Sequence, residues 1–379
     1  MPTSNKNHIA IIGTAGVPAC YGGFETLAHE LVCSLKESFN FTIYCSGKKY
    51  PQAERLTEWE GARLRYIPLS ANGIMSVFYD IWSMLHALRY ADILLVLGVS
   101  GCLFLPIIKL LSAKQVIVNL DGIEWRRAKW SGPAKWFLRV SEKMAVRYAD
   151  VLIADNEGIR QEIQKRYKRD TTTIAYGGNQ AFGVHATQAD ATRFPFLSKQ
   201  YAFKVCRIEP ENNIEIILKA FANQDELPLV LVGNWQHSEW SRAMYAQYAQ
   251  QANLILLDPI YEPHTLNLLR SNAYVYVHGH QAGGTNPSLV EAMSLGLPII
   301  SYDVIFNQET TAHEALYFTD VTSLQALLKW PPRRLHKMGK TMRKIAQERY
   351  TWEAISEAYS KVFQLQETRP TYTPTPHIV

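Results

Sequence analysis

The sequence predicts an α/β protein built from two doubly wound domains in series. The chain has 379 residues, which is too long for one ordinary core and suits two domains of roughly 150–200 residues each. Short apolar runs alternate with amphipathic stretches, which is typical of βαβ units and parallel sheets. A hydrophobic content of 47% and a charged content of 19% indicate a well-packed globular protein.

The first half opens with a buried strand and a helix. The strand is predicted over His8–Gly13, and apolar residues then recur at steps of three and four between Phe24 and Leu35, which predicts the helix. The further predicted strands of this half are Phe41–Cys45, Leu64–Ile67, Ile93–Leu97, Gln115–Asn119 and Val151–Ala154.

One stretch of this half resembles a membrane span. No charged residue occurs between Ile93 and Ile108. Gly98, Gly101 and Pro106 interrupt the stretch, and it is shorter than the roughly 20 residues that a spanning helix needs. We therefore expect a buried strand followed by a buried helix from about Gly101, with a membrane span as the alternative.

The second half repeats the scheme of the first. Its predicted strands are Phe203–Arg207, Leu229–Gly233, Leu254–Leu257, Ala273–His278 and Pro298–Tyr302. Its predicted helices are Glu215–Ala222, Ser238–Gln251, Pro263–Ser271, Pro287–Leu295 and, last, Trp352–Gln366. We expect one domain over residues 1–178, a second over 179–349, a helix over 350–366 that packs back on the first domain, and a disordered tail over 367–379.

Charge and cysteine usage restrict the partners and the compartment. Residues 1–180 contain 22 Lys and Arg against 16 Asp and Glu, so the basic excess lies in the first half and predicts an anionic partner there. The five cysteines show no Cys-x-x-Cys spacing, which argues against a disulfide framework or a zinc site. Residues 1–7 contain no apolar run before the chain enters the first predicted strand, so we expect no signal peptide and a cytoplasmic location.

A glycine loop before the predicted helix Pro287–Leu295 has the features of an anion site. Asn286 is a good N-cap and Pro287 suits the first helical position. The free amides of Ser288 and Leu289, together with the helix dipole, would bind phosphate. Gly283 and Gly284 would let the backbone approach a ligand closely. The segment is equally compatible with ordinary helix capping.

Two further loops strengthen the phosphate interpretation. Arg207 ends a predicted strand and can clamp a phosphate with two hydrogen bonds. The loop with Gly13, Gly16, Gly22 and Gly23 follows the first strand and opens a helix. It matches neither Gly-x-Gly-x-x-Gly nor the Walker pattern, which disfavours a dehydrogenase or an ATPase.

These segments together resemble GT-B fold glycosyltransferases of family 4, and most of all the bacterial rhamnosyltransferases that build capsules and O-antigens. The resemblance extends to about residue 365. It is carried by Ile12–Thr26, Asn119–Arg127, Ile153–Ile159, Arg207–Asn213 and Gly283–Met293. It implies two Rossmann-like domains that face each other across a cleft, with the acceptor on the first domain and a nucleotide-sugar donor on the second.

The resemblance also implies roles for single residues. Arg207 and the segment Thr285, Asn286, Pro287, Ser288 and Leu289 would hold the donor diphosphate, and Gly13, Gly16, Gly22 and Gly23 would close on it from the other domain. Glu291 would bond the sugar hydroxyls of the nucleoside, while Gly233, Asn234 and Ile260 would surround the base. His280, Gly283 and Gly284 would line the donor sugar, and Glu25, Asp121 and Glu124 the acceptor.

Two positions depart from the family pattern. The first Glu of the Glu-x7-Glu motif falls at Gly283, and the usual Lys falls at Asn212. Both departures are typical of the rhamnosyltransferase subgroup, and a 6-deoxy sugar needs fewer polar contacts. We therefore expect transfer of L-rhamnose from dTDP-rhamnose to a lipid-linked glycan.

Arg207 and Asp121 are the candidate catalytic residues. Arg207 and helix-start amides would stabilise the leaving diphosphate. Family members retain the anomeric configuration, with the leaving phosphate taking the acceptor proton. Asp121 would orient the acceptor or act as a base, with a helix N-cap as the alternative; for Glu25 the sequence favours helix capping, and for His278 a core position. No Asp-x-Asp and no His, Cys and Asp cluster occurs, so we expect no metal and no cofactor.

The segment Trp125–Tyr148 combines basic and aromatic residues. Its cations Arg126, Arg127, Lys129, Lys135, Arg139, Lys143 and Arg147 face only one acid, Glu142, and Trp125, Trp130, Trp136 and Phe137 are interleaved with them. This pattern predicts peripheral contact with the anionic inner face of the cytoplasmic membrane, with a solvated basic helix as the alternative. No nucleic-acid motif accompanies it.

Two other functions stay open at the level of sequence. The same fold could use a UDP- or GDP-hexose donor. A non-catalytic sugar-binding protein of this fold is the other reading, supported by the missing Glu and Lys and opposed by Arg207, Glu291 and both glycine loops. The acceptor, the linkage and the oligomeric state are not encoded in any motif that we identify.

Overall fold

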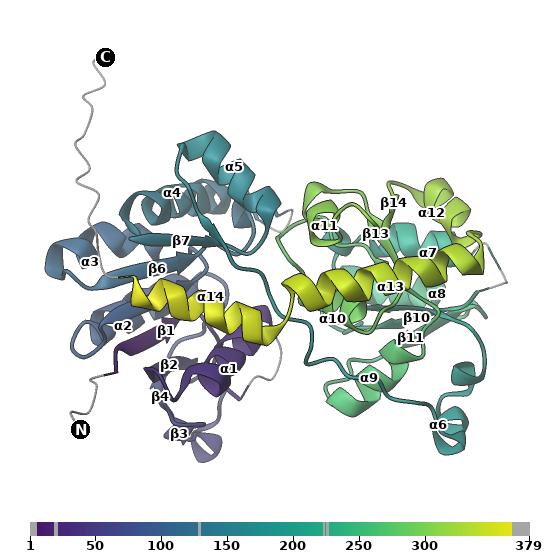
Figure 1. Cartoon of the computed structure of the whole chain (residues 1–379), viewed down its shortest axis with the longest axis horizontal. Helices are drawn as coiled ribbons and strands as arrows, with labels where there is room; N and C mark the ends of the chain where they lie inside the picture. The colour runs from purple at the N-terminus through teal and green to yellow at the C-terminus, as the bar shows by residue number, and fades with distance from the viewer. Residues whose placement is uncertain (1–5, 19–21, 128–129, 223, 225–226, 366–379) are drawn as a thin grey trace.

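A computed structural model describes residues 6–365 except 19–21, 128–129, 223 and 225–226. It contains two parallel sheets in two lobes joined by a long helical segment along one side (Figure 1). The α/β fold class with two Rossmann-like domains is therefore confirmed. The predicted disordered tail lies outside the described residues.

The first lobe is built on an eight-stranded sheet in the order β3-β4-β2-β1-β5-β6-β7-β8. All pairs are parallel except the short edge strand β3 with β4. The strands are β1 His8–Ile12, β2 Asn40–Ser46, β3 Glu58–Trp59, β4 Ala62–Ile67, β5 Ile93–Leu97, β6 Gln115–Asn119, β7 Val151–Ala154 and β8 Thr172–Thr173. The helices are α1 Gly23–Leu35, α2 Met75–Ala87, α3 Leu105–Leu111, α4 Gly132–Tyr148 and α5 Glu157–Tyr167.

The second lobe is built on a six-stranded parallel sheet in the order β11-β10-β9-β12-β13-β14. Its strands are β9 Ala202–Val205, β10 Leu229–Val232, β11 Leu254–Leu257, β12 Val275–His278, β13 Ile299–Tyr302 and β14 Leu316–Phe318. Its helices are α6 Gln188–Arg193, α7 Ile214–Ala222, α8 Glu239–Tyr248, α9 Pro263–Ser271, α10 Pro287–Ser294, α11 Ile305–Thr310, α12 Val321–Leu328 and α13 Pro332–Arg349.

Both sheets change winding direction next to their first strand. The switch lies between β1 and β5 in the first lobe and between β9 and β12 in the second. Ligands of open α/β sheets bind outside the carboxyl ends of the strands at such a switch. The loops after β1, β9 and β12 therefore start at the positions where a ligand site is expected.

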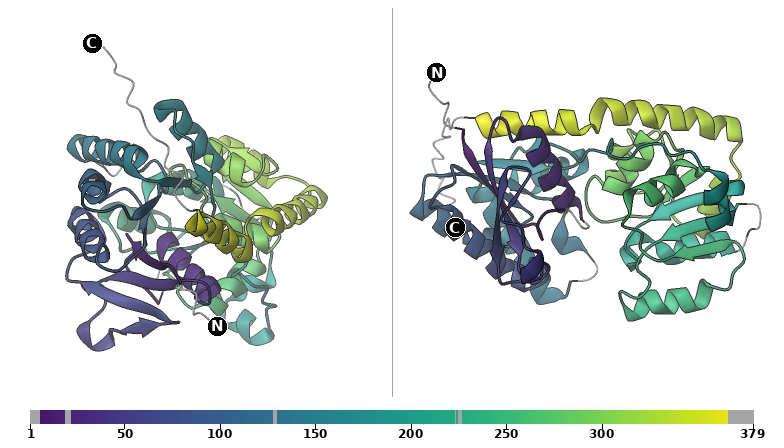
Figure 2. Two further views of the ribbon diagram at one scale, coloured as in Figure 1. Left: turned by 60° about the vertical axis from the view of Figure 1, so that its left-hand side comes forward. Right: turned by 90° about the horizontal axis from the view of Figure 1, so that it is seen from below.

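The last helix, α14 Trp352–Gln364, returns to the first lobe. It packs on α1 and adds Ile355, Tyr359, Val362 and Phe363 to the core on that face of the first sheet. In the right view of Figure 2, α13 and α14 run one after the other along the side of both lobes. The first domain is therefore completed by the end of the chain.

The opposite face of the first sheet is covered by α2, α3 and α4. The expectation of a buried helix after Gly101 is wrong in part, because α3 begins only at Leu105 and has one exposed side. Leu110 and Leu111 lie on that side and are exposed to solvent. None of the helices within the described residues combines the length and the apolar character needed to cross a membrane. The described cysteines Cys33, Cys45, Cys102 and Cys206 are all free.

Candidate functional site

The loops at the carboxyl ends of the two sheets meet across the lobes. A Cβ atom built at Gly23, which begins α1, would lie 3.6 Å from the ring of Pro287, which begins α10. Gly122, after β6, packs so closely on the backbone of Gly283 that a Cβ there would overlap it. The N-termini of α1 and α10 therefore face each other beside the glycine loop that follows β12.

Asn286 caps α10 and uses the amides that the sequence assigned to a ligand. Its Oδ1 accepts the Ser288 N–H at 3.1 Å and the Ser288 hydroxyl at 2.7 Å. The Leu289 N–H donates to the Asn286 carbonyl at 3.0 Å. The expectation of free amides at Ser288 and Leu289 is therefore wrong for this state, because the N-cap satisfies them. A phosphate at this helix start must displace the Asn286 side chain.

Arg207 is available to an anion. It lies exposed just after β9, and its ion pair with Glu209 is long, at 3.9 Å. A guanidinium held this loosely keeps donors for a bidentate contact. Its predicted place at the carboxyl end of β9, on the second sheet's switch point, is the place that the structure gives it.

Asn212, at the position of the usual Lys, ties the Arg207 loop together. Its Nδ2 donates to the Arg207 carbonyl at 2.7 Å, and its Oδ1 lies 2.6 Å from Nδ1 of His280. Because Oδ1 is an acceptor, His280 carries its proton on Nδ1. Burial lowers the pKa of His280 to about 3, so the ring is neutral.

The other ring nitrogen of His280 faces the glycine loop. A Cβ at Gly283 would lie 2.9 Å from Nε2, and Gly283 has a positive φ of 121°. The bare backbone of Gly283 thus lies between Nε2 and Gly122 of the first domain. Nε2 is left as a hydrogen-bond acceptor beside the position proposed for the donor sugar.

Asp121 has a strained backbone at the end of β6. Its φ is 57°, and its N–H donates to the Asn119 side chain at 3.0 Å. The helical turn that follows is Glu124–Arg126, and its N-cap is Ile123. The alternative of Asp121 as a helix N-cap is therefore wrong. Left-handed non-glycine residues are costly and occur often at functional sites.

Asp155 is a buried carboxylate that the sequence prediction missed. It follows β7, is 1% exposed, and neither of its oxygens has a hydrogen-bond partner among the described residues. A Cβ at Gly284 of the second domain would overlap this carboxylate. Burial and the nearby Asp121 raise the pKa of Asp155 well above its usual range. Its position after a strand, on the same sheet edge as Asp121, is a signal that could have identified it.

Thr285 joins the two domains. It is buried, and its hydroxyl donates to the Asp155 carbonyl at 2.5 Å. Asn156, the next residue, donates to the Phe306 carbonyl at 3.1 Å and to the Thr310 hydroxyl at 3.1 Å. The Thr285 hydroxyl is therefore used by the domain contact, and the place of Thr285 on the diphosphate stays a prediction.

The glycines of the first loop fall into two groups, one packed inside the first domain and one at the border of the cleft. A Cβ at Gly13 would overlap the Leu97 carbonyl of β5, and one at Gly16 would press on Cys45 and Tyr50. These two glycines allow close packing, and their contact with the donor stays a prediction. Gly22 and Gly23 lie at the start of α1 and border the cleft.

Glu25 holds this loop through a hydrogen bond to its backbone. Its carboxylate is buried and accepts the Ala15 N–H at 2.6 Å. Burial raises the pKa of Glu25 even against this hydrogen bond. The N-cap of α1 is Gly22, which has no side-chain cap. Glu25 therefore holds the loop, and the expectation that it caps the helix is wrong, while its contact with the acceptor stays a prediction.

Arg127 clamps the two domains together. Its guanidinium pairs with Glu124 of its own loop at 3.2 Å, with Glu209 at 3.5 Å and, more closely, with Glu211. Trp130 donates its indole N–H to Glu124 at 3.0 Å. The structure thus places Glu124 in an internal ion pair rather than free for an acceptor.

Glu291, which was predicted to bond the sugar hydroxyls of the nucleoside, has two protein partners. Its Oε2 pairs with the buried Arg270 at 2.5 Å, and its Oε1 accepts from Gln180 at 2.8 Å. Sequence reasoning missed both partners, because Arg270 lies inside an ordinary helix pattern and Gln180 in the segment between the lobes. Carboxylate oxygens have further lone pairs, so Glu291 keeps acceptor capacity for a hydroxyl.

The residues that were predicted to surround the nucleobase differ in their exposure to solvent. A Cβ at Gly233 would press on Ile208 at 2.5 Å, so Gly233 permits packing of the Arg207 loop. Asn234 is exposed and its Oδ1 accepts the Gln236 N–H at 3.0 Å in a turn. Ile260 is partly buried against the second core. His278 is buried, and neither ring nitrogen has a partner among the described residues.

The part of the chain that the structure describes contains no group of three or more His, Cys, Asp or Glu residues that could hold a metal ion.

Comparison with known families divides the chain between two families. The family described as "Domain of unknown function (DUF1972)" matches residues 6–179, and the family "Glycosyl transferases group 1" matches residues 188–352. No curated protein sequence matches the chain at a significant level.

Several solved structures share the whole architecture. Sucrose-phosphate synthase from Thermosynechococcus elongatus superimposes with a TM-score of 0.80 at 17% identity, covering 95% of this chain and 98% of that one. HepE from Anabaena in complex with UDP-glucose gives 0.70 at 14% identity, covering 94% and 100%. A protein described as trehalose-6-phosphate from E. coli, bound with UDP-2-fluoro glucose, gives 0.68 at 10% identity, covering 95% and 100%. At these identities the likeness concerns the fold.

Proposed function

We propose that the chain transfers a sugar from a nucleotide-sugar donor to a glycan acceptor. Its second domain matches the family of group 1 glycosyl transferases over residues 188–352, which supports this reaction. The observation that carries this proposal is the meeting of two helix starts, at Gly23 and Pro287, with Arg207 at the end of β9, the strand next to β12. Helix N-termini and an arginine are the groups that stabilise a leaving diphosphate.

For the donor we propose dTDP-rhamnose and L-rhamnose as the transferred sugar. The missing carboxylate at Gly283 has a physical reason, because Gly283 has a φ of 121° and a Cβ there would lie only 2.9 Å from Nε2 of His280. The sugar pocket wall there is backbone and the neutral His280 ring, which suits a sugar with one hydroxyl fewer.

A UDP-hexose donor is the second candidate. Two proteins with the same fold have been solved with UDP-glucose and with UDP-2-fluoro glucose. In this alternative His280 Nε2 and Glu291 keep their places, and only the nucleobase and the sugar differ.

The proposed mechanism retains the anomeric configuration. As the bond from the anomeric carbon to the phosphate breaks, Arg207 and the α10 amides, freed from Asn286, would take up the developing charge. The acceptor hydroxyl would attack from the same face and pass its proton to the leaving phosphate. Asp121 would orient the acceptor. No metal ion or cofactor is part of this proposal.

We propose a lipid-linked glycan of bacterial surface polysaccharide as the acceptor. The protein would then work on the inner face of the cytoplasmic membrane, with contact through the basic part of 125–148. In the structure Arg139, Lys143, Arg147 and Trp136 of α4 are exposed, which supports this contact. Trp125, however, is enclosed by Arg139 and Arg166 and donates to Glu142, and Lys129 lies outside the described residues.

A nucleotide panel tests the donor. Thermal shift with dTDP, UDP and GDP should show the largest stabilisation with dTDP, and incubation with dTDP-rhamnose and candidate lipid-linked acceptors should then give product. Stabilisation by UDP alone, with product from UDP-glucose, would establish the second candidate. No response to any nucleotide, together with no transfer, would contradict the enzymatic function itself.

A further inference from the structure

Helix α2 carries apolar residues on both of its sides. Its buried side packs Tyr79, Met84 and Ala87 into the core beside three polar residues, while Phe78 and Trp82 on its outer side are 57% and 55% exposed. Ile74, just before the helix, is 80% exposed. Surface helices normally turn their apolar stripe toward the core. An apolar stripe at four-residue spacing on the outside therefore indicates a surface with a partner.

The neighbouring helix α3 continues this apolar surface. Its exposed side carries Ile107, Leu110 and Leu111, and Leu110 is 84% exposed. Figure 2, in its left view, shows α2, α3 and α4 side by side on one face of the first sheet. Of sixteen exposed large hydrophobic residues in the described part of the chain, ten lie on these helices or directly beside them. Patches of this size mark interaction sites.

The charge on the same layer has one sign. The only acids in α2, α3 and α4 are Asp80 and Glu142, and both are buried. Arg139, Lys143 and Arg147 of α4 are exposed, and no ion pair within the described residues involves them. An apolar surface flanked by cations without outward acids complements an anionic lipid surface. A second copy of the chain would instead bring like charges together.

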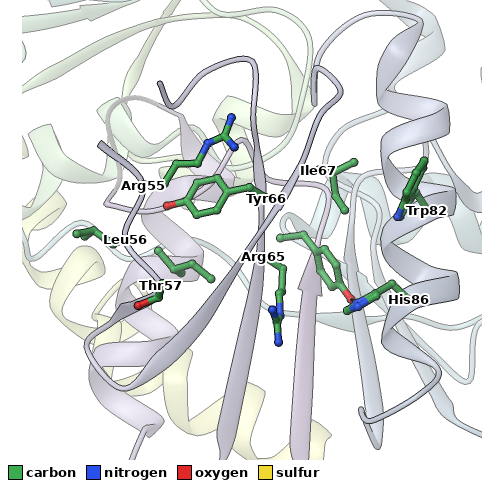
Figure 3. Close-up of a pocket in the computed structure, with 10 residues that line it drawn as sticks. Arg55, Leu56, Thr57, Arg65, Tyr66, Ile67, Trp82 and His86 are labelled. Carbon is green, nitrogen blue, oxygen red and sulfur yellow. Dashed lines mark hydrogen bonds between the residues drawn. The ribbon is translucent and has the colours of Figure 1, made fainter. Parts of the chain in front are cut away.

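A pocket at the edge of this surface offers a place for a headgroup. Trp82 and His86 of α2 line a hollow of about 400 Å³ together with Tyr44, Arg55 and Arg65 (Figure 3). His86 Nδ1 is bonded to the Tyr44 hydroxyl at 2.7 Å, so its ring is fixed. Arg65 is exposed, and no ion pair to it is found in the described part of the molecule. A phosphate could contact Arg65 while its acyl chains follow Trp82 and Phe78.

We infer that the outer face of α2 and α3 docks on an anionic phospholipid bilayer, with a headgroup phosphate in the Arg65 and Trp82 pocket and α4 as the cationic flank. This inference rests on the membrane contact proposed above and specifies which residues make it. It moves the apolar part of that contact from Trp125 to Phe78, Trp82 and Leu110.

Flotation with vesicles tests the surface. The probes are vesicles of phosphatidylcholine alone and of phosphatidylcholine with phosphatidylglycerol. The full chain should float with the anionic vesicles and much less with the neutral ones. The double variant Phe78→Ser, Trp82→Ser should lower the bound fraction by about tenfold or more, because two large apolar side chains leave the lipid. Leu110→Ser on α3 is an independent second variant.

The controls separate docking from folding and from catalysis. Phe182→Ser removes an exposed aromatic of the second domain and should float like the wild type. Arg65→Gln should weaken binding to anionic vesicles and leave the residual binding to neutral ones unchanged. All of these positions are exposed, so thermal stability should stay unchanged. Flotation needs neither donor nor acceptor, so a failure of transfer and a failure of docking are separate results.

Two outcomes would overturn the inference. One is a wild type that stays in solution with both kinds of vesicle. The other is a wild-type dimer, seen by light scattering, that the α2 double variant dissociates while vesicle binding stays the same, because that result would assign the surface to a second copy.

Discussion

At the scale of single residues, the site holds one exposed cation and several enclosed carboxylates. Arg207 has only a long ion pair, whereas Glu291, Glu124 and Glu211 are paired with arginines and Asp155 lies buried without a partner. A donor diphosphate brings negative charge into this environment. Arg207 is therefore the side chain on which donor binding and leaving-group stabilisation depend most.

Replacement of Arg207 tests this dependence. Arg207→Ala should lower kcat/KM by about a hundredfold or more, since one donor lost from a developing oxyanion has an effect of that order. Thermal stability should not change, because the side chain is exposed. Arg242→Ala, which removes an exposed arginine of α8 in the same domain, is the matched control. Equal kinetics for both variants would contradict the assignment.

The ionisation of Asp155 should contribute to the pH dependence of the protein's thermal stability. Because the pKa of Asp155 is raised in the folded protein, ionisation favours the unfolded chain. The penalty is absent below about pH 3, where both states are protonated, and grows as the pH rises from there toward the folded pKa. Asp155→Asn should therefore melt higher than the wild type at pH 8 and at the same temperature near pH 3.

Asp80 provides the comparison for Asp155. It lies on the buried side of α2, where burial raises its pKa to about 8. Asp80→Asn should show the same convergence of melting temperatures near pH 3 with unchanged transfer. Asp155→Asn should also lower transfer, because the carboxylate lies against Gly284. A flat difference in melting temperature across pH for Asp155→Asn would show that its carboxyl is not the titrating group.

At the scale of elements, the glycine loop after β12 can pack against the loop after β6 because Gly122, which has no side chain, lies opposite it. Gly122→Ala should push the loop after β6 away from Gly283 and lower transfer by about tenfold or more, since small displacements of reacting groups have large kinetic effects. Donor affinity should fall as well. Gly132→Ala, at the start of α4 with open space around it, is the matched control and should keep wild-type rates. Full activity of Gly122→Ala would contradict the proposed closure.

Regular elements were predictable where burial and periodicity agree. The predicted spans of β5, β6, β7, β11 and α9 coincide with the structure, because their apolar patterns are uniform and glycine, proline or a polar cap ends them. Helix α2 was not identified, because apolar residues lie on both of its sides and no single apolar stripe marks its buried face. The loops of the site were located correctly, but their contacts were not, because Asn286, Thr285 and Glu25 find partners far away in sequence.

At the scale of the whole molecule, the chain crosses between the lobes twice at one place. The Trp352 N–H donates to Asn179 at 2.8 Å, its indole N–H to Gln180 at 2.8 Å, and the Gly178 N–H donates to the Tyr350 carbonyl at 2.8 Å. Gln180 in turn donates to Glu291. The hinge between the lobes is thus hydrogen-bonded to the proposed nucleoside contact.

Trp352 should couple the stability of the two lobes. Trp352→Ala removes a buried indole and should destabilise the first domain by about 3 kcal/mol or more. We expect the single thermal transition to separate into two in calorimetry. Leu365→Ala, at the exposed end of the same segment, should melt like the wild type. A variant that melts in one transition at the wild-type temperature would argue against this coupling.

The return of α14 to the first lobe also affects synthesis of the protein. The first domain is the first part to leave the ribosome, but its core lacks Ile355, Tyr359, Val362 and Phe363 until the last helix has been made. Domains usually fold in the order in which they are translated. Here the second domain can complete its core earlier, and the nascent first domain must keep the apolar surface beside α1 free of wrong partners until α14 has left the ribosome.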